Sequence, residues 1–400
     1  MKKVLLSLLA VAMTVTVVDA QKKKEAPKPE GYVFTTVKAN PITSIKNQAR
    51  SSTCWSFSGI SFLESEIIKA GGADTSLNLS EMFVVSKAYS DRAEKFVRLD
   101  GKLNFSPGSD FGDVLTVFKN YGAVPESEMK GLNYGEANHV HGELDAVTRA
   151  YVEAIAKNPN RKLSTAWKRG FEAVEAAYLG AVPEKFTYKG KEYTPKSFAE
   201  SLKINADDYI SLTSYTHHPF YTAFAVEVPD NWRSTLSYNV PVDELIQIMD
   251  NAIANGYTIA WAADVSEKGF TRNGIAIVAD YEANERSGSD ESRWIGVSAQ
   301  EKEAAIYNLN APGKERIITQ ELRQEEFDNK RTTDDHGMHI YGIAKDQNGT
   351  EYYMVKNSWG TGSKYKGTWY VSKPYAKFKT MNIVVNKKAV PAEILKKLGL

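Results

Sequence analysis

The sequence has 400 residues, of which 42% are hydrophobic and 25% charged, and its formal net charge at pH 7 is +1. This balance lacks the basic excess that attracts nucleic acid or an anionic membrane, so neither is an expected partner. The length allows one large core or two substantial lobes. Cys54 is the only cysteine, which excludes an intrachain disulfide and a thiolate metal cage and leaves an inert thiol or a reactive one.

The first forty residues are expected to precede the folded domain. A short basic start, an apolar stretch over 4–18 and small residues just before position 21 are typical of a cleaved export signal over 1–20. The polar, proline-punctuated sequence that follows predicts a disordered leader over 21–40. The protein is therefore expected to be exported, periplasmic or secreted, with no membrane span in the mature chain. Keeping one unpaired thiol in an oxidising compartment favours a reactive role for Cys54.

The first part of the domain shows helical periodicity. Apolar residues recur at helical spacing after Trp55 until Gly71 and Gly72 end the run, so Cys54 is expected at the N-terminus of a helix of roughly fifteen residues. Further helices are expected from Ser80, over 113–120, within 142–180 and over Val242–Asn255. The segment 185–240 is expected to be irregular.

After Gly256 the period changes to alternation, which predicts strands over 257–263, 339–343, 352–356 and 368–371. The charged segment 280–335 is expected to be looped. Together these patterns predict an α+β fold over 41–400, with a helical lobe and insertion over about 41–255 and a β-rich lobe over about 256–390.

A thiol that cleaves an acyl bond needs deprotonation, an acid–base partner and donors for the oxyanion. The N-terminus of a helix carries a positive partial charge, which is expected to lower the pKa of the Cys54 thiol. Three candidate partners lie elsewhere in the sequence. Gln48 stands six residues before Cys54, His336 precedes one predicted strand, and Asn357 follows another.

These residues lie in blocks similar to the active-site blocks of papain-like cysteine peptidases: Gln48, Ser51-Ser52-Thr53-Cys54-Trp55-Ser56-Phe57, Asp335-His336-Gly337 and Lys356-Asn357-Ser358-Trp359-Gly360. The separation of Cys54 and His336 is roughly twice the ~130–150 residues of ordinary papain-type chains. Such an insertion resembles the bleomycin hydrolase and aminopeptidase C branch. The resemblance runs from about Ile42 to Lys388 and implies a papain-like two-lobe fold, with a large helical insertion, a β-barrel-like C-terminal lobe and a cleft between the lobes.

The resemblance also implies a role for each site residue. Cys54 would be the nucleophile, and His336 would hold it as a thiolate–imidazolium pair and then protonate the leaving amine. Asn357 would orient His336, with Trp359 shielding their hydrogen bond from water. Gln48 and the backbone N–H of Cys54 would form the oxyanion hole. The implied activity is that of a cysteine-type aminopeptidase acting on peptides without a cofactor.

The C-terminal sequence departs from the pattern of that branch, in which a terminal carboxylate usually reaches into the cleft and holds the free amine of the substrate. Residues 391–400 lack the usual proline-containing apolar tail. Either Leu400 does the same job from a different path, or the cleft is open. An endopeptidase or dipeptidyl-type peptidase, and a peptide-binding protein without turnover, therefore stay open as alternatives. The hexameric homo-oligomer of the branch stays open as well.

The other histidines have simpler interpretations. His339 alternates along a predicted strand, which favours His336 as the base. The pairs His139/His141 and His217/His218 have no carboxylate or thiolate at a ligand-like spacing in the sequence. Zinc sites need three or four such ligands, so these histidines are expected to be exposed or packed, and no metal is expected.

Overall fold

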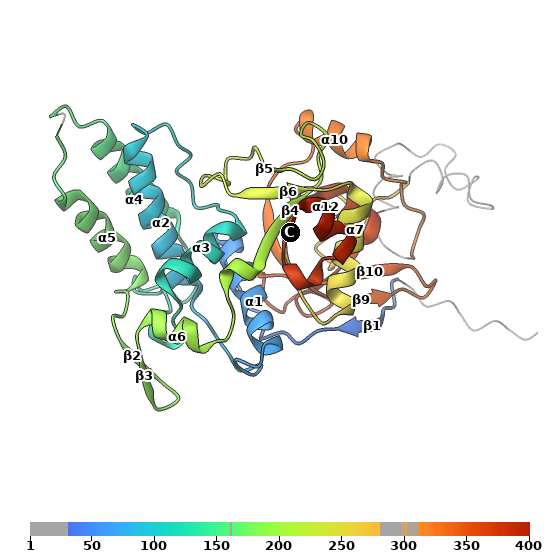
Figure 1. Cartoon of the computed structure of the whole chain (residues 1–400), viewed down its shortest axis with the longest axis horizontal. Coiled ribbons are helices and arrows are strands. Elements are labelled where there is room, and N and C mark those ends of the chain that lie inside the picture. Colours follow the sequence, from blue (N-terminus) through green and yellow to red (C-terminus); the bar gives the residue numbers. More distant parts are fainter. Residues whose placement is uncertain (1–30, 161, 281–297, 299–300, 302–306, 308–310) are drawn as a thin grey trace, which may run out of the picture.

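Helix α1 (Cys54–Lys69) lies at the centre of the fold, between a helical lobe and a β-rich lobe (Figure 1). The computed structural model describes residues 31–160, 162–280, 298, 301, 307 and 311–400. Every residue of α1 from Trp55 to Ile67 is buried. Helices α2 (Glu81–Arg98) and α3 (Phe111–Tyr121) cover one side of α1, and strands β7 (Ile259–Ala263) and β9 (His336–Lys345) cover the other. A helix enclosed in this way has a fixed position, and so does the cysteine at its first turn.

The helical lobe is built on the same hydrophobic cluster as α1. Two of its helices begin at these side-chain caps: Ser80 accepts a hydrogen bond from the backbone N–H of Phe83, and Asp110 accepts one from that of Asp113. The elements of this lobe are α2 (Glu81–Arg98), α3 (Phe111–Tyr121), α4 (Gly142–Ala156), α5 (Ala166–Leu179), the hairpin of β2 (Phe186–Tyr188) and β3 (Lys191–Tyr193), and α6 (Pro195–Ser201).

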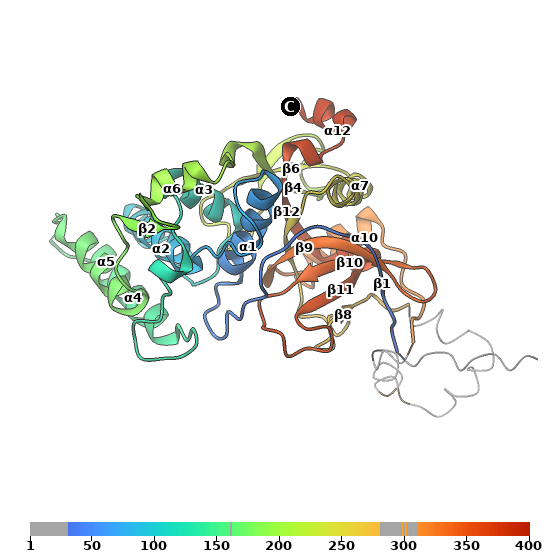
Figure 2. The same ribbon diagram turned by 90° about the horizontal axis from the view of Figure 1, so that it is seen from below.

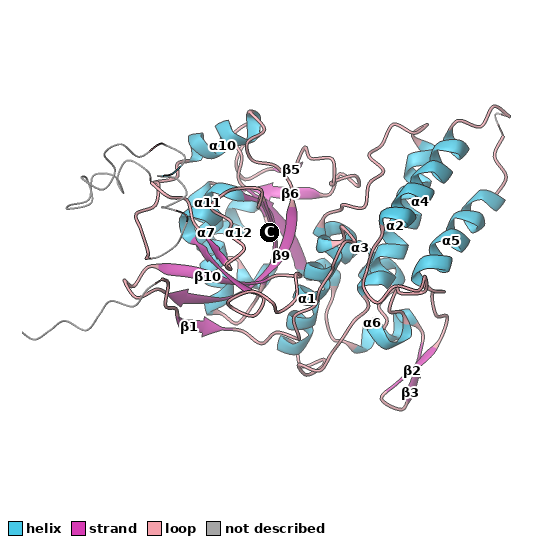
Figure 3. Ribbon diagram, turned by 180° about the vertical axis from the view of Figure 1, so that it is seen from behind, coloured by secondary structure: helices cyan, strands magenta, loops and turns pink. Residues whose placement is uncertain are grey.

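The β-rich lobe is built on a ten-stranded sheet in the order β5-β6-β4-β12-β7-β9-β10-β11-β8, with β1 paired to β9. Figure 3 shows this sheet in one half of the molecule and α2 to α6 in the other. The strands are β1 (Thr35–Ala39), β4 (Tyr209–Thr213), β5 (Ala223–Ala225), β6 (Leu236–Asn239), β7 (Ile259–Ala263), β8 (Ile275–Ala276), β9 (His336–Lys345), β10 (Glu351–Lys356), β11 (Thr368–Ser372) and β12 (Thr380–Asn386). The helices of this lobe are α7 (Val242–Ala254), α10 (Gln320–Asp328), α11 (Lys373–Lys379) and α12 (Ala392–Leu398).

The α+β class, the helix that begins at Cys54 and the four predicted strands are confirmed. The lobe boundary predicted near residue 255 is wrong. β4, β5, β6 and α7 precede it in sequence but belong to the β-rich lobe, since β4 pairs with β12 and α7 packs into the core of that lobe. Short strands between irregular aromatic segments show little periodicity, so the sequence pattern did not predict them.

The disorder predicted up to residue 40 is also wrong for its last part. Residues Thr35–Ala39 form β1, which pairs antiparallel with β9. All five side chains of β1 are exposed, so backbone pairing with β9 holds this strand in place. Because no face of the strand is buried, its sequence shows no apolar alternation. The predicted export signal and residues 21–30 lie outside the described residues. Within the described part of the chain, none of the helices is long and apolar enough to cross a membrane.

The segment 280–335, expected to be looped, contains α10, and a buried arginine on this helix ties it to the sheet. The guanidinium of Arg323 is fully buried, and the hydrogen bonds that it donates to described residues all go to backbone carbonyls. These carbonyls belong to Ser214, Lys377, Phe378 and Thr380. Arg323 therefore joins α10, the segment after β4 and the α11–β12 junction.

We expect Arg323→Ala to lower the free energy of unfolding by about 3 kcal/mol or more, because several buried carbonyls lose a charged donor. Urea denaturation followed by circular dichroism measures this. Arg331→Ala is the matched control, since its side chain is 73% exposed, and we expect it to cost less than about 1 kcal/mol. Equal midpoints for the two variants would contradict this role of Arg323.

Candidate active site

The turn before α1 is held against the segment that follows β10. The backbone N–H of Gln48 donates to Ser358 O at 2.8 Å, and that of Gly360 donates to Lys46 O at 3.0 Å. Asn47 and Trp359 form the antiparallel bridge between these two bonds. As a result, the chain enters α1 at Cys54 from a point fixed on the β-rich lobe.

His336 and Asn357 come together because β9 and β10 are antiparallel neighbours. His336 Nε2 lies 2.8 Å from Asn357 Oδ1, which also accepts the backbone N–H of Ser358 at 2.7 Å. The oxygen of Asn357 therefore faces the histidine, so Nε2 carries the proton and Nδ1 is the basic nitrogen. The ring of Trp359 stacks on that of His336 with centroids 4.8 Å apart, and its position agrees with the predicted shielding.

Cys54 and His336 line one pocket. His339 does not line it: its ring is fully buried, and Nδ1 lies 2.9 Å from Ser61 Oγ on α1. The structure thus brings His336, and not His339, to the pocket of Cys54, in agreement with the sequence prediction. Cys54 itself is partly accessible.

Burial dominates the electrostatics of this pair. It raises the pKa of the Cys54 thiol to about 11, against the opposing effect of the backbone N–H groups of Gly337 and Trp55. It also lowers the pKa of His336 to about 4. The lowering expected from the helix N-terminus is present, through the N–H of Trp55, but desolvation outweighs it. Proton transfer from thiol to imidazole forms both charges side by side, and their attraction offsets part of this cost.

Gln48 lies beside Ser358 and outside the lining of this pocket. Its Oε1 accepts the Ser358 hydroxyl at 2.5 Å, while the described residues offer no hydrogen-bond partner to its Nε2. The amide is thus oriented by its oxygen, and its N–H donors are left for another acceptor. This geometry suits the predicted oxyanion role, with the acceptor still to be supplied by a substrate carbonyl.

Carboxylates that sequence reasoning did not single out share the pocket with Cys54. Asp110 comes from the loop before α3, Asp230 from the loop between β5 and β6, and Asp334 and Asp335 from the approach to β9. The only sequence signal was the pair of aspartates directly before His336. Asp110 and Asp230 are far from both motifs in the chain, so their convergence required the fold.

Leu400 is not brought to this pocket. Its side chain is 46% exposed, and its backbone N–H bonds back to Leu395 O at the end of α12. Helix α12 lies against α7, where Lys397 bonds Glu244 at 2.6 Å (Figure 2). The structure therefore does not support Leu400 as the group that holds a substrate amine in the pocket.

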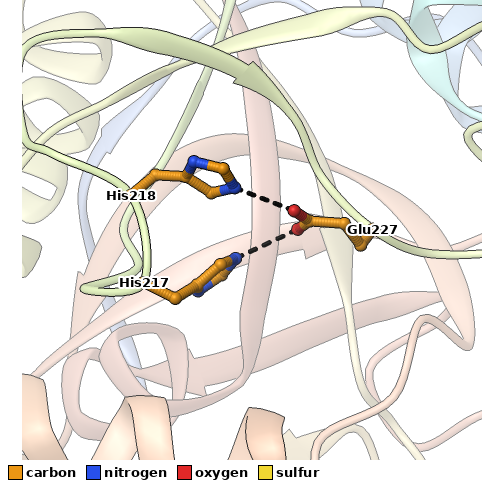
Figure 4. A group of neighbouring side chains, drawn as sticks. All are labelled: His217, His218 and Glu227. Carbon is orange, nitrogen blue, oxygen red and sulfur yellow. Dashed lines mark hydrogen bonds and ion pairs between the residues drawn. The ribbon is translucent and has the colours of Figure 1, made fainter.

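His217 and His218 do have a carboxylate beside them, contrary to the reading of the sequence. Figure 4 shows the carboxylate of Glu227 facing both rings from one side, and its oxygens lie 3.0 Å from His217 Nε2 and 2.8 Å from His218 Nε2. The three ligand-type atoms lie within 4.8 Å of one another. Ten and nine residues separate the partners in sequence, a spacing that no metal motif indicates.

The protonation pattern of this group favours a hydrogen-bonded tether over a metal site. Gln324 Oε1 accepts the backbone N–H of Thr216, so Gln324 Nε2 faces His217 Nδ1 at 3.0 Å and donates to it. His217 then carries its proton on Nε2 and donates it to Glu227, and a donor N–H cannot ligate a metal. Glu227 lies between Val226 and Val228, which line the pocket of Cys54, so the tether fixes one wall of that pocket.

The other histidine pair is packed, as expected. His141 is fully buried, and its ring lies edge-on to that of His139 with centroids 5.7 Å apart and to that of Tyr134 at 6.4 Å.

The family model of the Peptidase C1-like family matches residues 3–294 and 291–399. The chain belongs to this family. It is 24% identical over 403 residues to bleomycin hydrolase of Gallus gallus, covering 89% of this chain and 82% of that protein, and 24% identical over 432 residues to bleomycin hydrolase of Homo sapiens, covering 96% and 89%. Aminopeptidase C of Listeria monocytogenes is 23% identical over 396 residues, covering 88% and 82%.

Among solved structures, PepW from Lactobacillus rhamnosis is similar with a TM-score of 0.66 and 18% identity, covering 91% of this chain and 84% of that one. The predicted resemblance to the bleomycin hydrolase and aminopeptidase C branch is confirmed, as are the papain-like two-lobe fold and the cysteine-type peptidase class.

We expect Gln48→Glu to lower kcat by about 100- to 1000-fold with little change in KM, because the variant keeps the acceptor for Ser358 but loses the Nε2 donor to the oxyanion. Steady-state hydrolysis of a fluorogenic peptide measures this. Gln347→Glu, which bonds Gly31 and Val33, is the matched control. A kcat of Gln48→Glu equal to that of the control would remove Gln48 from the oxyanion site.

Proposed function

We propose that this protein is a cysteine-type aminopeptidase that releases residues from the free amino ends of peptides, with Cys54 as nucleophile. The observation that carries the proposal is the shared pocket of Cys54 and His336, in which Asn357 directs the basic nitrogen of His336 away from itself. The relatives named bleomycin hydrolase and aminopeptidase C support action at the amino end.

The first half-reaction follows from this arrangement. The Cys54 thiol gives its proton to His336 Nδ1, and the sulfur attacks the carbonyl carbon of the scissile bond. The oxyanion that forms accepts hydrogen bonds from the backbone N–H of Cys54 and from Gln48 Nε2. The imidazolium, oriented by Asn357 and covered by Trp359, then gives its proton to the leaving amine, and a thioester to Cys54 remains.

The second half-reaction reverses these roles. A water gives a proton to His336 Nδ1 while its oxygen attacks the thioester carbon, and the tetrahedral intermediate collapses with expulsion of the Cys54 sulfur. The sulfur recovers the proton from His336, so the enzyme returns to its neutral thiol and imidazole. Burial favours these neutral forms at rest, in accord with the pKa shifts of both groups.

An endopeptidase or dipeptidyl-type peptidase is the second candidate, and the position of Leu400 away from the pocket favours it. A peptide-binding protein without turnover is less well supported, because Cys54, His336, Asn357 and Gln48 are all present. Export to the periplasm or the medium stays a proposal from residues 1–20, and hexamer formation stays a proposal from the resemblance alone.

We expect the protein to hydrolyse a fluorogenic peptide with a free amino end much faster than its acetylated counterpart, and Cys54→Ala to hydrolyse neither. Fluorescence assays under reducing conditions measure both rates, and thermal unfolding of Cys54→Ala checks that the variant is folded. Equal rates on the two peptides would favour the endopeptidase. Activity of Cys54→Ala would overturn the thiol mechanism.

A further inference from the structure

The pocket of Cys54 gathers four carboxyl groups. Asp110, Asp230, Asp334 and Asp335 all line it, together with His336. His336 is neutral at pH 7, because burial lowers its pKa to about 4. The pocket lining contains no lysine or arginine among the described residues. Burial first, and neighbouring carboxylates second, raise the pKa of Asp110 to about 8 and that of Asp334 to about 7, so part of this group is protonated at pH 7. A cation that binds in the pocket favours the ionised carboxylates and is attracted by them.

Two of these carboxylates make hydrogen bonds within the fold, and these bonds account for their presence. Asp335 accepts the backbone N–H of Ser266 at 3.1 Å and the Thr333 hydroxyl at 2.8 Å. One oxygen of Asp110 caps α3 by accepting the N–H of Asp113 at 3.2 Å. Asp335 is thus engaged through both oxygens, while Asp110 caps α3 and also lines the pocket.

The other two carboxylates are weakly held or not held at all. Asp230 receives only long bonds of 3.4 Å from Asn104 and Ser106, and it lies near the charge of Arg92. Asp334 lines the pocket and is half-buried, and it has no hydrogen-bond or ion-pair partner among the described residues. Burial, and after it the negative charges of Asp230 and Asp335, raise the pKa of Asp334, and no positive charge opposes them. Fold stability therefore gives no reason for a carboxylate at this position.

We propose that Asp334, assisted by Asp110 and Asp230, binds a cationic amine of the peptide substrate, which is its free α-amino group if the proposed aminopeptidase function holds. An ammonium group offers three donors and one positive charge, which matches a wall of carboxylate oxygens with open acceptor positions. The site lies in the same pocket as the nucleophile, so an amine held there places the adjoining carbonyl near Cys54. The group that selects free amino ends is then built into the pocket wall.

Binding of the amine also acts on the nucleophile. The charges of Asp334 and Asp230 add to burial in raising the pKa of the Cys54 thiol. An ammonium group between them and the sulfur cancels this contribution and favours the thiolate. Recognition of the substrate amine and activation of Cys54 are therefore coupled through one set of charges.

Two substitutions test the site by turnover. We expect Asp334→Asn to lower kcat/KM by about 10- to 100-fold on leucyl-aminomethylcoumarin, mainly through KM, as the loss of a charged hydrogen bond predicts. Hydrolysis of the acetylated form is expected to be unaffected. Asp145→Asn is the matched control, because burial also raises the pKa of Asp145, to about 7, but this residue lines a different pocket. Equal values for the two variants, or equal losses on both substrates, would overturn the proposal.

An acetylated lysyl substrate distinguishes the two sources of a cationic amine. Loss of activity in Asp334→Asn on the free-amine leucyl substrate alone assigns the site to the α-amino group. Loss of activity on the acetylated lysyl substrate alone assigns the site to a basic side chain of the substrate. The cation site then stands, and the aminopeptidase assignment is wrong.

A second measurement does not depend on turnover. Cys54 is the only thiol, so the mass gained with iodoacetamide reports its reactivity alone. We expect leucinamide to move the midpoint of the pH profile of alkylation to lower pH, and N-acetylleucinamide to leave it unchanged. In Asp334→Asn the midpoint without leucinamide is expected to lie at lower pH than in the wild type, and adding leucinamide is expected not to move it. The same leucinamide shift in both proteins, or none in the wild type, would overturn the proposal.

The two measurements separate failure of this site from failure of the proposed function. Hydrolysis restricted to free amino ends but indifferent to Asp334→Asn means that the aminopeptidase stands and the amine site is wrong. A leucinamide shift that depends on Asp334, in a protein that hydrolyses acetylated and free peptides equally, means that the amine site stands and the aminopeptidase assignment is wrong.

Discussion

The backbone pairing between residues 46–48 and 358–360 is the contact on which the rest of the site depends. It joins the turn that leads into α1 to the segment that carries Asn357 and Trp359, two pieces of chain about 310 residues apart in sequence. Because α1 is enclosed between the lobes, this pairing fixes Cys54 relative to the strands that carry His336. Rigid placement of nucleophile and base spares the reaction the entropy of bringing them together.

Burial of the catalytic pair has an electrostatic cost. Burial drives both the thiol and the imidazole toward their neutral forms, and the aspartates of the pocket make the thiolate still less favourable. The catalytic ion pair must then be formed by proton transfer within the pair and supported by charges that come with the substrate. In this account the carboxylates of the pocket keep the thiol of Cys54 protonated and unreactive until an amine binds. Such control suits a thiol that is the only one in the chain. The same charges thus serve selection of substrate and control of reactivity.

The sequence predicted the parts of the site that lie within local motifs. Cys54 stands at a recognisable helix start, and His336 and Asn357 flank strands whose alternation is clear. The resemblance to the peptidase family implied that these three residues come together, and the structure places them as expected. Asp110 and Asp230 lie on irregular loops whose path depends on tertiary packing, and no local pattern predicts that they reach one pocket. The net pKa of Cys54 could not be predicted either, because it depends on how deeply the fold encloses the sulfur.

The same limit applies to the fold. α7, β7, β9, β10 and β11 were predicted because their apolar residues repeat with a clear period, whereas β8 and β12 were missed and β1 and β4 to β6 were missed or assigned to the wrong lobe. β1 exposes every side chain, and β5 and β6 are short, so pairing with distant strands defines them more than their own residues do.

The most direct test of the central claim is time-resolved mass spectrometry of a short unblocked peptide incubated with the reduced protein. The account predicts a ladder of products that lose one residue at a time from the amino end, because the pocket wall holds the amine beside the first peptide bond. Internal fragments, or a ladder that descends two residues at a time, would contradict it.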